Sequence, residues 1–224
     1  MDRPEIPCLR GNRLCRLQKR NSYYPGGSYL MVMKTYEETI AFHGHSCGGL
    51  ALGYKAAEYA VKLLDLSFSP DEEVVCIAET DSCAVDAVQA VLGCTAGKGN
   101  LIIHKWGKMA FSFYRRDTGA SVRLLKRPEP QDDEVKELRG KVFSGRASAE
   151  EVKEYRAVMD VRIKALLKTP PEEIFLVKEA EELLPAPAMV YDDVICSVCG
   201  ETAAEGLCRK VNGKYICPSC ARKL

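Results

Sequence analysis

Residues 74–92 read VVCIAETDSCAVDAVQAVL, and this stretch decides the fold. Its first part, Val74–Ala78, is a continuous apolar run of strand length, which predicts a central strand buried on both faces. The polar residues after it end the strand. Asp81 or Ser82 is then expected to cap a helix that runs through Leu92 and stops at the glycine that follows.

Similar patterns predict the elements on either side. A capping-box pattern, Thr35-x-x-Glu38, predicts a short helix from Tyr36, and apolar residues at three- and four-residue steps predict a second helix to about Leu66. Downstream we expect a strand over 101–104, a hairpin over 109–115 and 121–126, helices beginning near 133 and 149, and a strand over 174–178. This mixture predicts an α+β fold, in which helices pack on a mixed or antiparallel sheet.

The composition is that of an ordinary globular protein. Hydrophobic residues make up 46% and charged residues 28%, and 32 Lys+Arg against 31 Asp+Glu give a net charge of +1. This balance gives the surface as a whole no electrostatic attraction for nucleic acid or an anionic membrane. No apolar run approaches the ~18 residues of a membrane-spanning helix. We therefore expect no membrane partner, and nucleic acid as a partner only through a local basic segment.

The unusual feature is eleven cysteines against only three histidines. An odd cysteine count in a chain of 224 residues is untypical of a secreted disulfide scaffold. We therefore interpret the compartment as reducing, the protein as cytoplasmic, and the cysteines as thiols and metal ligands.

Composition divides the chain into three segments. Residues 1–33 carry six basic and two acidic side chains and predict a poorly ordered basic extension, with a nucleic-acid-binding arm as the alternative. Residues 34–187 are expected to form the α+β core. Pro185 and Pro187 mark a linker, and residues 188–224 form a small cysteine-rich module.

The module contains the most specific motif of the chain. Cys196-x2-Cys199 and, seventeen residues later, Cys217-x2-Cys220 each place two sulfurs on one tight turn, which is the spacing of a structural four-thiolate zinc site. An Asn-Gly pair between them predicts a hairpin that brings the second pair onto the first. A redox dithiol or an iron centre is the alternative. Cys208 does not fit the spacing.

A second concentration of ligands lies in the core, where residues 43–49 read HGHSCGG. Cys47 is expected at the start of the second helix and Cys83 at the start of the third, where the partial positive charge of a helix N-terminus favours the thiolate. With His43 or His45 these thiols can form a metal or redox site that leaves coordination positions open to water or substrate.

A purely structural interpretation of the same residues stays open. Cysteine is a common core residue, so Cys47 and Cys83 can be small hydrophobic side chains, as we expect for Cys76 in the middle of its strand. Asp81 and Asp86 flank Cys83, where a carboxylate can orient a ligand or simply form a salt bridge.

The loop over 93–99, GCTAGKG, has part of the pattern of a phosphate-binding loop. Its glycine spacing is one short, no Ser or Thr follows the lysine, and a helix precedes it instead of a strand. Gly97, Lys98 and Gly99 are therefore candidates for a small anion- or cofactor-binding nest, and a plain tight turn is the alternative.

Three motifs in a fixed order carry a family resemblance. Residues 42–54 read FHGHSCGGLALGY, residues 81–89 read DSCAVDAVQ, and residues 93–101 read GCTAGKGNL. Together they resemble the FmdE family of formylmethanofuran dehydrogenase proteins over about residues 36–126, in which a zinc module is a known accessory. The resemblance implies an α+β core, a zinc finger of ribbon or treble-clef type, and a homodimer.

The resemblance also implies site residues. Four residues match positions around the family's active-site metal, a second transition metal beside zinc: His43, His45, Cys47 and Cys83. Four more match other motif positions: Asp81, Asp86, Cys94 and Lys98. One departure is the glycine at position 48, where the family usually has proline, because glycine loosens the loop around the motif cysteine.

Two hypotheses of function follow. The first is a metalloprotein of redox or one-carbon metabolism, associated with molybdenum or tungsten formylmethanofuran dehydrogenase-type chemistry. In it Cys47 and Cys83 are thiolate ligands or nucleophiles, an imidazole such as His45 completes the site, and Asp81 or Asp86 assists as acid or base. A small-molecule substrate or a partner enzyme subunit is expected. The second hypothesis is a non-catalytic adaptor or regulator whose zinc module binds a partner protein or nucleic acid.

Overall fold

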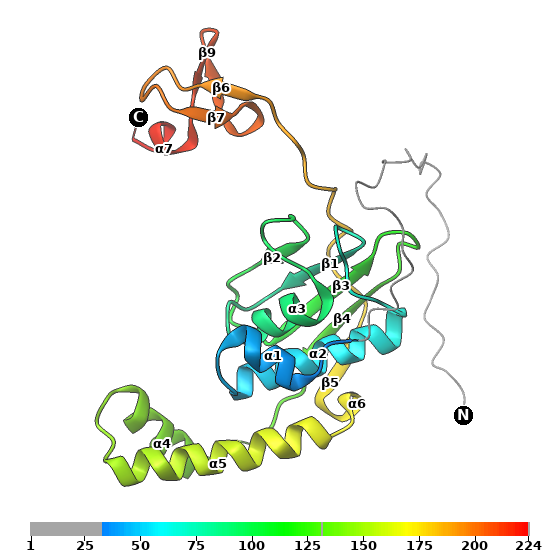
Figure 1. The fold of residues 1–224 in the computed structure, drawn as a ribbon, viewed down its shortest axis with the longest axis vertical. Helices are drawn as coiled ribbons and strands as arrows, with labels where there is room; N and C mark the ends of the chain where they lie inside the picture. Colours follow the sequence, from blue (N-terminus) through cyan, green and yellow to red (C-terminus); the bar gives the residue numbers. More distant parts are fainter. Residues whose placement is uncertain (1–32, 131, 224) are drawn as a thin grey trace. The chain divides into compact units, whose positions relative to one another are not determined.

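The computed structural model describes residues 33–130 and 132–223 (Figure 1). The contacts divide the chain into a larger unit that ends at Ala186 and a smaller unit, Pro187–Leu224. Apart from Met33, the predicted basic extension lies outside the described residues. None of the described helices is both long enough and apolar enough to cross a membrane.

A five-stranded sheet in the order β2-β1-β3-β4-β5 forms the centre of the larger unit. β1 and β2 are parallel, and every other neighbouring pair is antiparallel. The sheet is therefore mixed, and the predicted α+β fold is confirmed. The strands are β1 Val74–Ala78, β2 Leu101–Ile103, β3 Ala110–Arg115, β4 Ser121–Lys126 and β5 Phe175–Lys178.

The helices of the larger unit begin and end close to the predicted positions. The capping box is present, because the Glu38 N–H donates to Thr35 Oγ1 and the Thr35 N–H donates to the Glu38 carboxylate. Ile174, predicted as the start of the last strand, belongs instead to a short helix before it. The helices are α1 Tyr36–His43, α2 Gly48–Leu64, α3 Ala84–Leu92, α4 Asp133–Phe143, α5 Ala149–Lys168 and α6 Pro171–Ile174.

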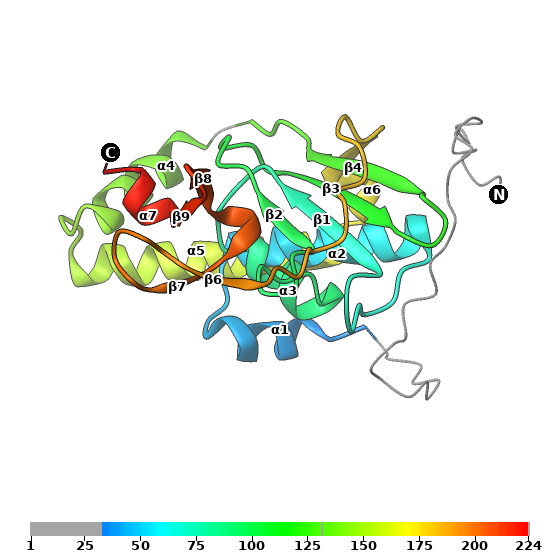
Figure 2. The same cartoon turned by 90° about the horizontal axis from the view of Figure 1, so that it is seen from above.

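β1 is buried on both faces, as its apolar run predicts. On one face Cys76 packs into the main core with side chains of α2 and α3, which lie on the same side of the sheet (Figure 2). On the other face Val75 and Ile77 pack with Tyr114, and Leu184 from the segment after β5 packs against them. That segment therefore covers the face of the sheet opposite α2 and α3.

The start of α3 differs from the prediction. Cys83 is the N-cap, and no side chain caps the helix. The Asp81 carboxylate instead lies 3.1 Å from Lys105 Nζ, and Ser82 Oγ is buried without a hydrogen-bond partner among the described residues. The prediction that Asp81 or Ser82 caps α3 is therefore wrong. Both residue types can cap a helix, but the Asp81 carboxylate pairs with Lys105, and the local backbone directs the Ser82 hydroxyl away from the helix start.

Gly53 of α2 allows α2 and α3 to pack closely. A Cβ at this position would lie 2.1 Å from the carbonyl oxygen of Ala84, which no side chain can accept. We expect Gly53→Ala to lower the free energy of unfolding by ~1–3 kcal/mol through overpacking, measured by urea denaturation.

A matched substitution controls for this effect. Gly140 lies inside α4, and a Cβ there would meet nothing within 4 Å. Gly140→Ala should therefore raise the free energy of unfolding by about 0.5–1 kcal/mol, because alanine loses less backbone entropy in a helix. Equal stability of the two variants would contradict the packing account.

The described part of the smaller unit contains two hairpins, a short 3-10 helix and a short α-helix. Asn212 and Gly213 have φ of 48° and 79°, the left-handed pair that a two-residue hairpin turn requires, and the predicted hairpin forms there. The elements are β6 Asp193–Ile195, β7 Thr202–Ala204, the 3-10 helix η1 Glu205–Leu207, β8 Arg209–Val211, β9 Lys214–Ile216 and α7 Pro218–Ala221.

Candidate metal centres

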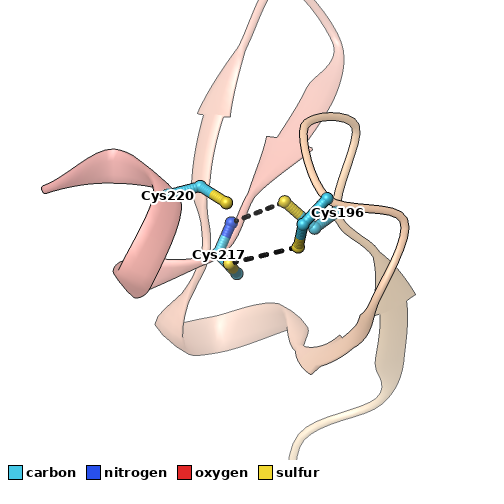
Figure 3. Close-up of side chains that lie close together, drawn as sticks. Cys196, Cys217 and Cys220 are labelled. Atoms are coloured by element: carbon cyan, nitrogen blue, oxygen red, sulfur yellow. Dashed lines mark hydrogen bonds between the residues drawn. The ribbon is translucent and has the colours of Figure 1, made fainter. Parts of the chain in front are cut away.

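Four cysteines converge in the smaller unit, three of which, Cys196, Cys217 and Cys220, are labelled in Figure 3. The sulfurs of Cys196, Cys199, Cys217 and Cys220 all lie within 4.8 Å of one another. The first pair sits on the turn between β6 and β7, and the second pair sits at the start of α7. Sulfurs at ~2.3 Å from one tetrahedral ion have spacings of this size, so the four cysteines can hold a metal ion.

The thiols of this cluster cannot all ionise unaided. The Cys217 N–H donates to Cys196 Sγ at 3.3 Å (Figure 3). This bond, with those from Cys199 and Val198, lowers the pKa of Cys196 to about 6. The pKa of Cys220 is raised, because its thiol is hydrogen-bonded to that of Cys217. A bound cation removes this conflict by stabilising every thiolate at once.

The position of α7 bears on the architecture of the module. Cys217 is its N-cap, and Cys220 lies within it, so the second cysteine pair belongs to a helix, which is the arrangement expected of a treble clef. Cys208 packs beside the cluster but lies outside the four-sulfur group, in agreement with its spacing.

The core motif brings three predicted ligands together. α1 ends at His43, and Gly44 has a left-handed φ of 97°, which glycine adopts without strain. The chain reverses there, so the ring of His45 lies 4.5 Å from that of His43. One ligand atom each from His43, His45 and Cys47 lies within 4.8 Å of the others. Three such side chains can hold a metal ion and leave a coordination position open.

Asp86 orients His43 within this trio. The Asp86 Oδ2 lies 2.7 Å from Nδ1 of His43, while Nε2 of the same ring lies 3.9 Å from Cys47 Sγ. The carboxylate holds the proton on Nδ1 and leaves the Nε2 lone pair on the side of the thiol. Gln89 donates to Asp86 Oδ1 at 2.9 Å. The sequence analysis selected Asp86 but not Gln89. The one feature that could have identified Gln89 is its position three residues after Asp86 on the same helix.

The two core cysteines lie next to each other with different surroundings. Cys47 is the N-cap of α2, and the Leu50 N–H donates to its Sγ at 3.4 Å. Burial and the adjacent Cys47 raise the pKa of Cys83. Cys83 lies outside the three-residue group, and a Cβ at Gly49 would lie 3.2 Å from its Cβ. The site therefore combines a thiol at a helix start, where its sulfur accepts a backbone N–H, with a thiol that resists ionisation.

Other predicted site residues have partners of their own. The Lys105 ammonium lowers the pKa of Asp81, which therefore stays ionised on the surface. Lys98 Nζ donates to the carbonyl oxygens of Ser69 at 2.6 Å and Pro70 at 3.4 Å, so its charge stabilises the loop before β1. Cofactor binding by Lys98 with Gly97 and Gly99 stays a prediction.

Cys76 and Cys94 are structural. Both are fully buried in the main core. Burial raises the pKa of Cys94 to about 12 and raises that of Cys76 well above the usual range. Neither thiol therefore ionises at neutral pH, and the expectation that Cys76 is a small core side chain is confirmed.

The chain is similar to known proteins. A family model described as "FmdE, Molybdenum formylmethanofuran dehydrogenase operon" matches residues 42–176. A probable S-adenosyl-L-methionine-binding protein of Archaeoglobus fulgidus is 32% identical over 188 residues, which are 78% of this chain and 51% of that protein. The chain thus spans about half the length of this relative.

A solved structure is similar as well. It is a tungsten formylmethanofuran dehydrogenase FmdE-like protein from Syntrophus aciditrophicus, 26% identical with a TM-score of 0.51. The match covers 85% of this chain and 97% of that one. Because the family model covers more than half of the 224 residues, the chain belongs to the FmdE family.

Proposed function

We propose that this protein is a metalloprotein of redox or one-carbon metabolism, with a transition metal in the core and a structural zinc ion in the C-terminal module. The observation that supports the core site best is the connection from Asp86 through His43 to Cys47, with His45 beside it. Carboxylate-oriented histidine is the usual arrangement around a bound metal, and an isolated core histidine does not need it.

The donor set fits such a metal. One thiolate and two imidazoles suit Zn, Fe, Ni or Cu, and three protein ligands leave a position for substrate. A metal held there supplies Lewis-acid or redox chemistry. The chain's own residues have separate tasks. Asp86 fixes the proton on His43 Nδ1, Cys83 keeps its proton beside Cys47, and His45 presents its ring at the solvent-exposed side of the trio.

The biological setting of this proposal follows the family. We propose a cytoplasmic protein that acts on a small molecule, in association with molybdenum or tungsten formylmethanofuran dehydrogenase-type chemistry. The operon named in the family description supports a partner enzyme subunit, and a homodimer is the other assembly that we propose.

Asp86→Asn tests the proposed core site. A neutral amide holds the His43 tautomer less firmly, so we expect the affinity for Co²⁺ to fall by about 10–100-fold. The measurement is a titration of the thiolate-to-cobalt absorption band in protein whose C-terminal module already holds zinc. Asp81→Asn is the matched control, because Asp81 pairs with Lys105 outside the trio, and its cobalt affinity should not change. Equal affinities in the two variants would count against the site.

A second candidate function is the non-catalytic adaptor. One observation favours it: in the smaller unit Ile195, Val198 and Leu207 are 62%, 57% and 63% exposed. Apolar side chains that remain in solvent on a small module are typical of a docking surface. In this case the core would hold no metal, which separates the two candidates.

A further inference from the structure

A groove opens beside the start of α2 in the larger unit. Its volume is about 1080 Å³, and its walls come from α2, residues 108–109 just before β3, the end of β4 with the segment after it, and helices α4 and α5. Gly48, the residue after Cys47, lines it. A Cβ at Gly48 would lie 3.3 Å from Met159 Cε of α5, so the groove reaches the helix start that carries the Cys47 thiol.

The groove is apolar inside and cationic at its edges. Leu52, Leu125 and Leu166 are among its apolar lining residues. Six cationic side chains line it against two acidic ones. The acids are already paired, since Glu129 lies 3.0 Å from Lys126, and Asp132 lies 2.5 Å from Arg162.

The remaining cations include two whose side chains form neither an ion pair nor a hydrogen bond among the described residues. These are Lys136 and Arg139, three residues apart on α4 and both exposed. Lys108 and Arg127 also line the groove. The Lys108 Nζ lies 3.7 Å from the Glu79 carboxylate, and the Arg127 guanidinium donates a hydrogen bond to the Glu172 carbonyl oxygen. Its field therefore attracts anions.

We propose that this groove binds the substrate of the core centre, and that the substrate is an elongated organic anion. Its apolar body lies along the leucines, its carboxylate or phosphate groups lie at Lys136 and Arg139, and its reacting end lies near Cys47. The inference rests on the proposed function for the identity of that reacting site. The volume is at the upper end of the ~300–1,000 Å³ range of small-molecule sites, which suits an extended metabolite.

Calorimetric titration of the full metal-loaded chain at low ionic strength tests the proposal. Triglutamate probes the carboxylate source, tripolyphosphate probes the phosphate source, and triglutamine is the neutral control. We expect at least one anionic probe to bind and triglutamine not to bind. The double variant Lys136→Gln/Arg139→Gln should weaken that binding about tenfold or more.

The matched control is Lys153→Gln/Arg156→Gln, which removes the same two charges from exposed positions of α5 outside the groove. Its probe affinity should fall clearly less than that of the Lys136→Gln/Arg139→Gln variant, because neither residue lines the groove and so neither can contact a bound probe. Failure of both anionic probes to bind, or equal weakening in both double variants, would overturn the proposal.

The two proposals can fail separately. Cys47→Ser removes the thiol and leaves the groove cations in place, so probe affinity should persist while core metal is lost. Probe binding to a protein whose core never holds metal would refute the proposed function and leave the anion groove standing. A protein that holds core metal but binds neither probe would refute the anion groove and leave the proposed function standing.

Discussion

Replacing Cys196 with serine is expected to abolish metal binding in the C-terminal module and to unfold residues 187–224, while the larger unit stays folded. Its buried cluster consists of Cys196, Cys217 and Cys220, so the module has almost no apolar core of its own. A structural four-thiolate site contributes ~10–16 kcal/mol of binding free energy, which is then folding free energy. Serine cannot replace the thiolate, so this is the largest effect that we predict.

Metal analysis and amide hydrogen exchange measure this effect. The variant should contain one zinc ion fewer per chain, and amides of β6 to α7 should lose protection while those of β1 to β5 keep it. Cys208→Ser is the matched control, because Cys208 lies beside the cluster and outside the four sulfurs. Unchanged zinc in the Cys196 variant, or equal loss in the Cys208 variant, would refute the assignment.

Arg123→Met is expected to lower the free energy of unfolding of the larger unit by about 3–5 kcal/mol. Arg123 donates to both carboxylate oxygens of Glu79, at 2.6 and 2.9 Å, and both side chains are 5% exposed. Glu79 follows β1 and Arg123 lies on β4, so the pair joins two strands across β3. Methionine fills the space but leaves the Glu79 carboxylate buried, and Lys108, whose Nζ lies 3.7 Å away, is its one other ion-pair partner among the described residues.

Chemical denaturation with two controls tests this pair. Arg162→Met removes an arginine from an exposed pair with Asp132 and should cost less than about 1 kcal/mol. Glu79→Leu/Arg123→Met removes both buried charges and should recover much of the loss. If the double variant loses as much unfolding free energy as the two single variants together, the loss in Arg123→Met does not come from an unpaired buried carboxylate.

The same pair predicts a dependence on pH. The hydrogen bond from Arg123 holds the pKa of Glu79 below its usual value in the folded protein. The stabilisation is therefore complete above the unfolded-state pKa of about 4.3 and is lost as the pH falls through the lower folded value. The stability difference between wild type and Arg123→Met should shrink in acid, and a constant difference would show that the ion pair is not its cause.

The sequence allowed prediction of features that depend on local spacing. The apolar run over 74–78, the capping box at Thr35 and the two C-x2-C pairs each specify their structure within a few residues. The position of Cys47 at the start of a helix was likewise predictable from the neighbouring sequence. These features form in the structure because the groups that satisfy one another are neighbours in the chain.

Features that depend on distant partners were not predictable in this way. Asp86 meets His43 across 43 positions, and the choice between an orienting role and a surface salt bridge depended on how α1 packs against α3. Asp81 has a capping side chain, but Lys105, 24 positions away, binds it instead. The groove is formed by five separate segments, so its cationic edge has no signature in any one of them.

The most direct test of the central claim is the number of metal ions per chain in protein purified from its native cells. The account predicts two ions, one of which is lost in Cys47→Ala/Cys83→Ala, whose circular dichroism stays that of the wild type. A single ion per chain that this double variant retains would contradict the core metal centre and leave the C-terminal module as the one site that binds metal.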